Sequence, residues 1–248
     1  MSGQQPGSDP GAVRPVRVGP AAESAPQAFV EDLDHPELSP PDRHHLERSL
    51  RVRAGDEVVV ADGRGRWRLA RFGATVEPVG PVSVQPVVAP TLTVGFALVK
   101  GSRPELIVAK LTELGVDRIV ALGAARSVVR WDGDRAEGHR QRLARVAREA
   151  AMQSRRAWLP EVVLAASLGE LLRDTGTDAV ALAEPGGVAP SLAWPTVLVG
   201  PEGGWTDEEL QLTPTKVALG PQILRVETAA ITVGVLLSAL RAGLVGTV

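Results

Sequence analysis

Three glycine-rich segments each follow a short apolar run, and their residue types suit a ligand that is held by backbone groups. The clearest is Gly200-Pro201-Glu202-Gly203-Gly204. Gly220-Pro221 follows the run 216–219 in the same way, and Glu184-Pro185-Gly186-Gly187 follows the run 179–183. Glycine lets a ligand approach the main chain closely, and proline fixes a turn. One such turn has no need of a ligand, but the repeated form predicts a small-molecule pocket.

The elements around these segments alternate between short apolar runs and amphipathic stretches. The expected strands cover residues 91–99, 118–122, 179–183, 196–199 and 216–219. The expected helices cover residues 104–114, 139–155, 206–212 and 226–242. Two serine or threonine residues have the spacing of a capping box, Ser102 with Glu105 and Thr206 with Glu209. Strands that alternate with helices predict an α/β domain with a mostly parallel sheet covered on both faces, and ligands of such sheets bind at the carboxyl ends of the strands.

The N-terminal part of the chain has a different character. Residues 1–26 are rich in Gly, Pro, Ser and Gln, which predicts a disordered extension. A short helix at 41–50 and strand-like runs at 57–61, 67–72 and 82–84 follow, with the hairpin signal Asp62-Gly63 between the first two runs. We therefore expect a small β-rich domain over residues 27–88 and a larger domain over residues 89–248.

Composition excludes several classes of protein. The 248 residues are 44% hydrophobic and 23% charged, with no uninterrupted apolar run long enough to cross a bilayer, so no membrane span and a cytoplasmic location are expected. The absence of cysteine excludes disulfides and zinc-thiolate sites, and the four histidines have no metal-ligand spacing. The formal net charge of −2 argues against a generic nucleic-acid binder. However, the stretches 43–71 and 126–156 hold eight and nine arginines, which either contact RNA phosphates or form solvated surfaces.

The motifs resemble one known family. Over about residues 28–245 the chain resembles the RsmE-type 16S ribosomal RNA (uracil-N3)-methyltransferases of the SPOUT superfamily. The residues that carry the resemblance are His44-His45-Leu46, Asp62-Gly63-Arg64-Gly65, Lys100-Gly101, Glu113-Leu114-Gly115-Val116, Gly200 to Gly204 and Leu219 to Ala229. The last two are the most specific.

The resemblance implies a fold, a reaction and partners. The N-terminal domain would be a PUA-like β-barrel that helps to hold RNA. The C-terminal SPOUT domain would be tied in a deep trefoil knot and bind S-adenosylmethionine in the knotted loops. Such enzymes act as homodimers without a metal, and they methylate N3 of one uridine in 16S rRNA of the assembled small ribosomal subunit. A different SPOUT methyltransferase, or a non-catalytic RNA-binding protein with this fold, remains as an alternative.

The resemblance also assigns roles to residues. Those expected to bind the cofactor are Leu182, Glu184, Leu198, Val199, Gly200, Pro201, Glu202, Gly203, Gly204, Leu219, Gly220, Ile223, Leu224, Arg225, Thr228 and Ala229. Those expected to be catalytic are Arg225, Glu227 and Arg156. Uracil N3 must lose a proton before it attacks, so a base and a cation that stabilises the oxyanion would help. Arg225 is the expected cation. Glu202 and Glu227 are candidates for the base or for a structural anchor; for Glu202 the anchor is favoured, since its carboxylate could accept hydrogen bonds from turn amides, and for Glu227 both roles stay open.

RNA contact is expected from basic residues in both domains, namely Arg43, Arg48, Arg51, Lys100, Arg103 and Arg156. The chain departs from the family pattern at three positions. Met152 stands where Glu is usual, Arg155 where a small residue is usual, and Gln222 where Arg is frequent. The departures concern substrate contact and leave the glycine-rich cofactor segments intact.

Overall fold

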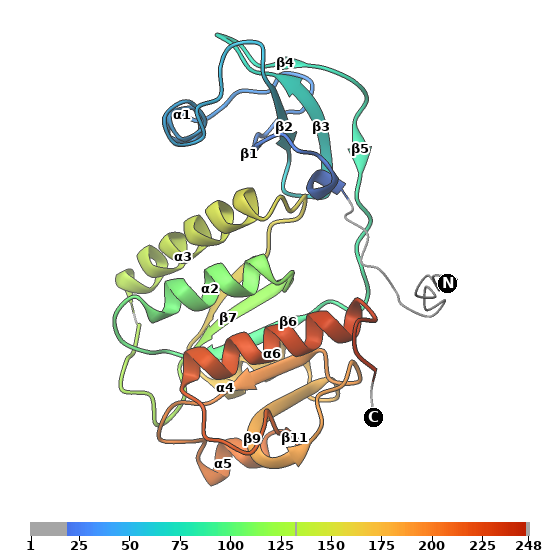
Figure 1. Cartoon of the computed structure of the whole chain (residues 1–248). Coiled ribbons are helices and arrows are strands. Elements are labelled where there is room, and N and C mark those ends of the chain that lie inside the picture. Colours follow the sequence, from blue (N-terminus) through green and yellow to red (C-terminus); the bar gives the residue numbers. More distant parts are fainter. Residues whose placement is uncertain (1–18, 132, 247–248) are drawn as a thin grey trace, which may run out of the picture.

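The computed structural model describes residues 19–131 and 133–246, and it has a smaller N-terminal part above a larger α/β part (Figure 1). Structure begins earlier than the sequence predicts, because Gly19–Ala22 forms a short 3-10 helix (η1) in which Pro20 is buried. Residues 1–18 of the expected disordered extension lie outside the described residues. Within the described ranges, no helix is both long enough and apolar enough to cross a membrane.

The N-terminal part is a small sheet with a helical segment packed beside it. Its elements are β1 (Gln27–Phe29), α1 (Pro40–His44), the π-helical turn η2 (His45–Ser49), β2 (Glu57–Ala61), β3 (Arg66–Arg71), β4 (Glu77–Pro78) and β5 (Ser83–Val84). β1 pairs with β2 in parallel, β2 and β3 form the predicted hairpin, and both β4 and β5 pair with β3. Leu46 of η2 is fully buried against Val58 and Val60, which fixes the helical segment on the sheet.

The larger part is built on a six-stranded sheet in which every neighbouring pair is parallel. The strand order is β11-β9-β10-β6-β7-β8. The bounds are β6 (Thr93–Ala97), β7 (Arg118–Leu122), β8 (Glu161–Ala165), β9 (Val180–Val188), β10 (Thr196–Val199) and β11 (Thr215–Val217). This arrangement confirms the predicted parallel α/β sheet.

Helices cover both faces of this sheet, as predicted (Figure 1). The helices of one face are α2 (Arg103–Glu113), α3 (Asp134–Gln153) and α6 (Val226–Arg241), and those of the other are α4 (Leu168–Thr175) and α5 (Asp207–Gln211). Along β6, Val94 and Phe96 pack toward the first group while Ala97 packs toward the second. Gly95 makes room for Leu198 of the neighbouring strand, because a Cβ at this position would collide with the leucine side chain. Alternate residues of each strand therefore belong to different cores.

Some local predictions are wrong in detail. The glycine-rich segment after residue 183 is assigned to β9, although its pairing with β11 jumps from Leu182 to Val188, so the residues between them leave the ladder as a bulge. α3 begins before the predicted start at residue 139. Ser102 precedes α2 without a capping side-chain hydrogen bond, whereas Thr206 and Glu209 form the complete capping box of α5.

The two parts are joined mainly through the end of α3 and the segment that follows it. Arg148 of α3 makes a bidentate ion pair with Asp42, with N–O distances of 2.8 and 2.7 Å, and also donates to the carbonyl of Phe29 at 3.1 Å. Trp158 donates its indole N–H to the carbonyl of Gln85 at 2.9 Å. Phe29, Ala61, Ala151 and Met152 form a small shared core beside these contacts. The α/β part and the N-terminal part therefore have a specific interface.

We expect Asp42→Asn to lower the free energy of unfolding by about 2 kcal/mol at neutral pH, because it leaves Arg148 without its charged partner. Burial raises the pKa of Asp42, but hydrogen bonds from Arg148 and Ser39 outweigh burial and hold the pKa below its usual 3.8. The carboxylate therefore stabilises the fold above about pH 4, and this contribution is lost as the pH falls further. Urea unfolding of both proteins should give a difference that shrinks in acid; a difference independent of pH would contradict this assignment.

Candidate active site

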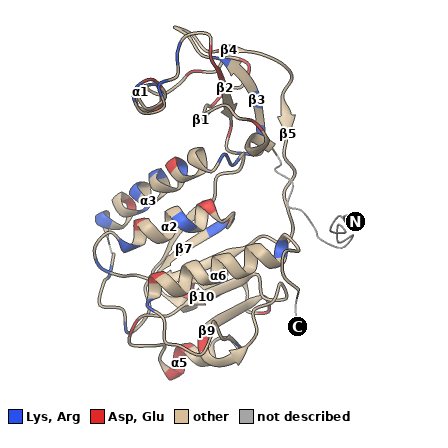
Figure 2. Cartoon of the chain, in the orientation of Figure 1, with Lys and Arg blue, Asp and Glu red and all other residues tan. Residues whose placement is uncertain are grey.

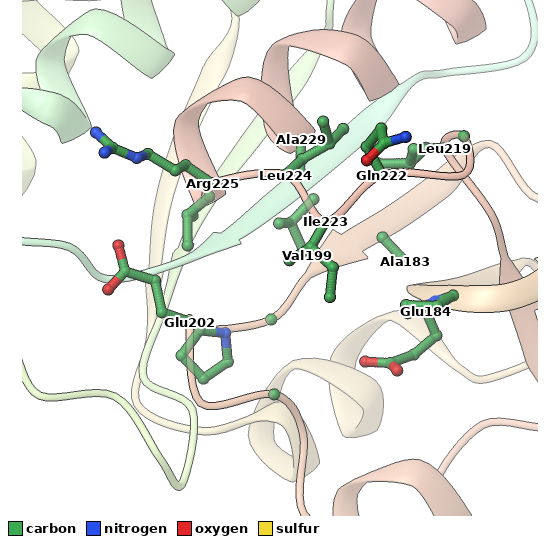
Figure 3. Close-up of a pocket in the computed structure, with 16 residues that line it drawn as sticks. Ala183, Glu184, Val199, Glu202, Leu219, Gln222, Ile223, Leu224, Arg225 and Ala229 are labelled. Carbon is green, nitrogen blue, oxygen red and sulfur yellow. The ribbon is translucent and has the colours of Figure 1, made fainter.

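A cavity of about 380 Å³ lies where the carboxyl ends of β9, β10 and β11 meet the start of α6 (Figure 3). Its walls come from three segments that are separate in sequence, residues 183–185, 199–204 and 219–229. The predicted ligand residues that line it are Glu184, Val199, Gly200, Pro201, Glu202, Gly204, Leu219, Gly220, Ile223, Leu224, Arg225 and Ala229. The structure therefore brings the three glycine-rich segments together around one pocket.

Four of the predicted ligand residues do not line this cavity. Leu182 and Leu198 are fully buried in the core on the opposite face of the sheet, because alternate residues of a strand point to opposite faces. Gly203 faces Arg126 at the outside of the turn, and Thr228 is exposed on α6. The sequence motif does not show this alternation, and a contact of these four residues with a ligand stays a prediction.

Four lining residues were missed by the sequence prediction, namely Ala183, Pro185, Gln222 and Val226. Ala183 follows Leu182 and pairs with Val199, so these two residues are neighbours on the same face of the sheet. A strict period-two reading of the strands would therefore have found Ala183. Gln222 lies between two predicted residues of the same loop, and its place in the wall makes this departure from the family pattern a feature of the pocket itself.

The turn after β10 is held in one conformation by contacts on both of its sides. Gly200 packs against the indole of Trp205, and a Cβ at this position would come within 2.8 Å of the ring. The amide of Gly204 donates to the carbonyl of Pro201 at 2.8 Å, and Gly204 has a φ of 71°, which glycine adopts readily. From outside, Arg126 donates to the carbonyls of Gly203 and Trp205, both at 3.0 Å. The backbone of the turn after β10 is therefore held rigid directly beside the cavity.

Charged side chains are distributed unequally around the cavity. In Figure 3, Glu202 and Arg225 lie toward one side and Glu184 toward the other. Arg103 of α2 pairs with Glu202 at 3.2 Å and with Glu227 at 3.6 Å, so it connects the turn after β10 to the first turn of α6. Burial raises the pKa of Glu184, against a smaller lowering effect of Lys216. Glu202 extends to Arg103 and is mostly exposed, rather than folding back onto the turn amides as expected for an anchor.

Glu227, a predicted catalytic residue, does not line the cavity but lies directly beside it on α6. Its side chain is mostly buried, and its Oε2 atom has no hydrogen-bond partner among the described residues although Arg103 lies at 3.6 Å. This position suits an anchor for α6 better than a proton acceptor for a bound molecule.

Arg156, predicted to be catalytic and to contact RNA, lies at the opposite edge of the sheet. Its guanidinium donates to the carbonyls of Thr112 and Val116 at 2.8 and 2.9 Å and lies 3.6 Å from Asp117. Burial lowers its pKa to about 10, partly opposed by Asp117. The segment between α3 and β8 must lie at the amino edge, because α3 runs back antiparallel to the strands. Within this chain Arg156 therefore has structural partners and lies away from the cavity, and its catalytic role and RNA contact stay predictions.

The other residues predicted to contact RNA fall into two groups. Arg43 donates to the carbonyls of Gly73 and Ala74, and Arg103 is committed to its two carboxylates, so both have structural partners. Arg48, Arg51 and Lys100 are exposed. Arginines also recur along α3, whereas acidic residues gather on α5 (Figure 2).

Comparison with known proteins agrees with this architecture. A family model described as "RNA methyltransferase domain" matches residues 88–238, and one described as "RNA methyltransferase PUA domain" matches residues 38–75. The fold and the site are those of an RNA methyltransferase with an N-terminal PUA domain. The "Ribosomal RNA small subunit methyltransferase E" of Mycobacterium tuberculosis (strain CDC 1551 / Oshkosh) is 36% identical over 75% of this chain and 79% of its own length. The Synechocystis protein of the same name is 35% identical over 75% and 67%. The chain belongs to the ribosomal RNA small subunit methyltransferase E family.

Solved structures extend the likeness across both parts of the molecule. The ribosomal RNA small subunit methyltransferase E of Neisseria gonorrhoeae, bound to S-adenosylmethionine, superposes with a TM-score of 0.74 at 26% identity and covers 87% of this chain and 98% of its own. A Legionella pneumophila methyltransferase in complex with the same cofactor gives 0.72 at 25% identity, covering 88% and 98%. The arrangement of a parallel α/β sheet with an N-terminal PUA domain is thereby confirmed.

We expect Arg126→Met to loosen the turn after β10, because it removes both hydrogen bonds from outside the turn. The free energy of unfolding should fall by about 1 kcal/mol, and the amides of residues 203–206 should exchange faster with solvent. Hydrogen exchange read by mass spectrometry measures the second effect. Arg130→Met is the matched control, since Arg130 of the same loop contacts the carbonyl of Ala125 at 3.4 Å. Equal exchange in the two variants would show that Arg126 does not hold the turn.

Proposed function

We propose that this chain transfers the methyl group of S-adenosylmethionine to N3 of a specific uridine in the 16S rRNA of the small ribosomal subunit, in the cytoplasm. The observation that carries the proposal is the cavity at the carboxyl ends of β9, β10 and β11. Its volume of about 380 Å³ falls within the range of small-molecule sites. The names of the relatives support the rRNA substrate, and the cofactor bound in two solved relatives supports S-adenosylmethionine as the methyl donor.

The residues of the cavity fit this cofactor. Val199, Ile223 and Leu224 offer apolar surface for an adenine ring, and the free backbone groups near Gly200 and Gly220 can bond its edge. Glu184 and Glu202 place carboxylates where a sulfonium cation and an ammonium group would be attracted. When bound, the cofactor supplies an electrophilic methyl group, so the protein needs to provide orientation and proton transfer.

The charged residues at one side of the cavity suit the target base. Uracil N3 attacks as an anion, whose charge spreads onto the two carbonyl oxygens of the ring. Arg225 lines the cavity and can stabilise this charge. Glu202 also lines the cavity and is exposed, so it is a better candidate to accept the N3 proton than Glu227. Arg103 positions both carboxylates.

The proposal includes the deep trefoil knot that the family resemblance implies. In its support, β9, β10 and β11 are neighbours at one end of the sheet, and the segments at their carboxyl ends meet around a single cavity. The test is to stretch the protein by force from its two ends. If the stretched chain reaches the full contour length of an unknotted chain, the knot is excluded.

We also propose a homodimer in which α6 faces a second copy of the chain. Between Glu227 and Arg241, α6 has no charged residue, and its outer surface is correspondingly tan in Figure 2. Val235 on this surface is 44% exposed, and Leu106 of the adjacent α2 is also exposed. Ile223 in the cavity wall is 90% exposed, so a second copy beside it would shield the site from water.

Sedimentation velocity tests the dimer. We expect Val235→Glu to convert the protein to a monomer, because a buried unpaired carboxylate in an interface costs several kcal/mol. Leu212→Glu is the control, since Leu212 is 43% exposed and follows α5 on the other face of the sheet. A dimer that withstands the first substitution, or a monomeric parent protein, would place the interface elsewhere or remove it.

The function itself is tested by methyl transfer to purified small ribosomal subunits. Labelled S-adenosylmethionine is incubated with subunits from a strain that lacks this activity, and the rRNA is digested to nucleosides. We expect the label in 3-methyluridine. Label in another nucleoside would assign a different specificity, and absence of label from a protein that binds the cofactor would overturn the proposed substrate.

A pair of matched variants tests the role of the cavity in cofactor binding. Ile223→Ala should weaken cofactor binding about fivefold, measured by titration calorimetry, because it removes apolar contact with the ring. Its stability should not change, since Ile223 is almost fully exposed. Val128→Ala, a similar apolar truncation at an exposed residue outside the cavity, should leave binding unchanged. Equal affinities of the two variants would remove Ile223 from the site.

A further inference from the structure

A second cavity, of about 550 Å³, lies between the PUA domain and the last turns of α3. The PUA side contributes the start of β1, Pro41 and Asp42 of α1, His45 at the start of η2 and Leu50 directly after η2. The other wall includes Glu149, Met152, Gln153 and Arg155. None of its lining residues belongs to the first cavity, and the end of α3 lies at the amino edge of the sheet, opposite the first cavity. Nothing in the proposed methyl transfer uses this space. We call it the interdomain cavity.

We propose that the interdomain cavity binds one unpaired nucleobase of the RNA substrate, at a distance from the uridine that is methylated. The inference rests on the proposed function, because it assumes that RNA is the substrate. It assigns the PUA domain and α3 a joint role in recognising a second position in the RNA.

The composition of the walls suits a flat ring with polar edges. Leu50, Met152 and Pro26 present apolar atoms, and Leu50 is 48% exposed although it is large and hydrophobic. Glu149 and Gln153 present acceptors on the exposed side of α3. Unpaired RNA bases bind by stacking on side chains while their edges are hydrogen-bonded. A base with an exocyclic amino group, such as cytosine or a purine, matches acceptors of this kind.

Gln27 leaves an acceptor unsatisfied in the wall of the interdomain cavity. Its side chain is almost completely buried, and its Nε2 donates to the carbonyl of Arg156 at 2.7 Å. Its Oε1 is buried and has no hydrogen-bond partner among the described residues. Buried polar atoms nearly always have a partner in the functional state. An N–H group of a bound base would supply the missing donor.

Backbone strain gathers at the same place. In the described ranges, the non-glycine residues with positive φ are Arg51, at 57°, and Arg155, at 56°. Arg155 lines the interdomain cavity, and Arg51 directly follows Leu50, which also lines it. Strained backbone of this kind costs about 1 kcal/mol or more per residue and clusters at ligand sites. Arg155 also donates to the carbonyls of Glu23 and Ser24, which holds the segment before β1 against α3.

Exposed positive charge lies next to Leu50 along the chain. Arg48, Arg51 and Arg53 are exposed within one short segment that includes Leu50. Arginines in such positions neutralise phosphates of a bound strand. In this arrangement the base of one nucleotide lies in the cavity and the neighbouring phosphates contact these arginines. The phosphate contacts are independent of sequence, whereas the contacts in the cavity depend on the base.

The first test compares two substitutions that add the same charge to the same domain. Leu50→Glu places a carboxylate in the interdomain cavity, and Val84→Glu places one on β5, where Val84 is 69% exposed and outside the cavity. We expect Leu50→Glu to raise the KM for small ribosomal subunits about tenfold, as loss of a stacked base would. Cofactor affinity, measured by calorimetry without RNA, should be the same in both variants. Equal KM values would overturn the proposal.

A neutral pair separates base recognition from general charge effects. Gln153→Ala removes a polar group from the cavity wall, while Gln141→Ala removes one from the exposed side of the same helix, where it contacts Glu137. We expect Gln153→Ala to raise the KM for small ribosomal subunits and Gln141→Ala to leave it unchanged. An equal effect of both would show that α3 contacts RNA without a base-specific site.

Crosslinking identifies the occupant directly. A photoreactive benzophenone amino acid at position 50 is irradiated in the complex of the full-length protein with small subunits, and the product is mapped by reverse transcription. We expect a crosslink at one unpaired rRNA nucleotide. Crosslinks to a ribosomal protein, or scattered over many nucleotides, would overturn the nucleobase assignment. If instead the unsubstituted protein transfers no methyl group to the subunits, it is the proposed function that fails, and the crosslink pattern still reports on the cavity.

Discussion

The parallel pairing of β9, β10 and β11 is the constraint on which the site depends. In a parallel sheet all carboxyl ends lie at one edge, so segments that are far apart in sequence meet there. The same pairing sets the alternation of side chains, which directs Ala183 and Val199 toward the cavity and Leu182 and Leu198 into the opposite core. The absence of a side chain at Gly95 of the neighbouring strand makes room for Leu198 on that opposite face. A one-residue shift in register would exchange the two sets.

Around this edge, the chain uses a few polar contacts to fix the backbone that faces the cavity. Arg126 holds the turn after β10 from outside, and Arg103 connects that turn to α6. Both arginines act on the protein itself, so their positive charges are not free for RNA. Arg225 is different, because it lines the cavity at the start of α6. A rigid pocket with one cation beside the open space is what a methyl transfer to an anionic base requires.

The interface between the PUA domain and α3 is the second feature that shapes the molecule. The ion pair of Arg148 with Asp42 and the contact of Trp158 with Gln85 set the position of the PUA domain against the sheet. The interdomain cavity lies beside these contacts, with Asp42 in its wall. If the proposed nucleobase binds there, the stability of the interface and the recognition of RNA would be coupled through the end of α3.

The sequence by itself determined the alternation of strands and helices, the capping box at Thr206 and the glycine-rich motifs, because these depend on residues close together in the chain. Most of the pocket followed from them. Only the tertiary structure decided that Arg156 lies at the opposite edge of the sheet, bonded to carbonyls at the end of α2. It also decided that Arg103 joins Glu202 to Glu227. Such contacts join residues far apart in the chain, and no local pattern specifies which side chains meet when the sheet forms.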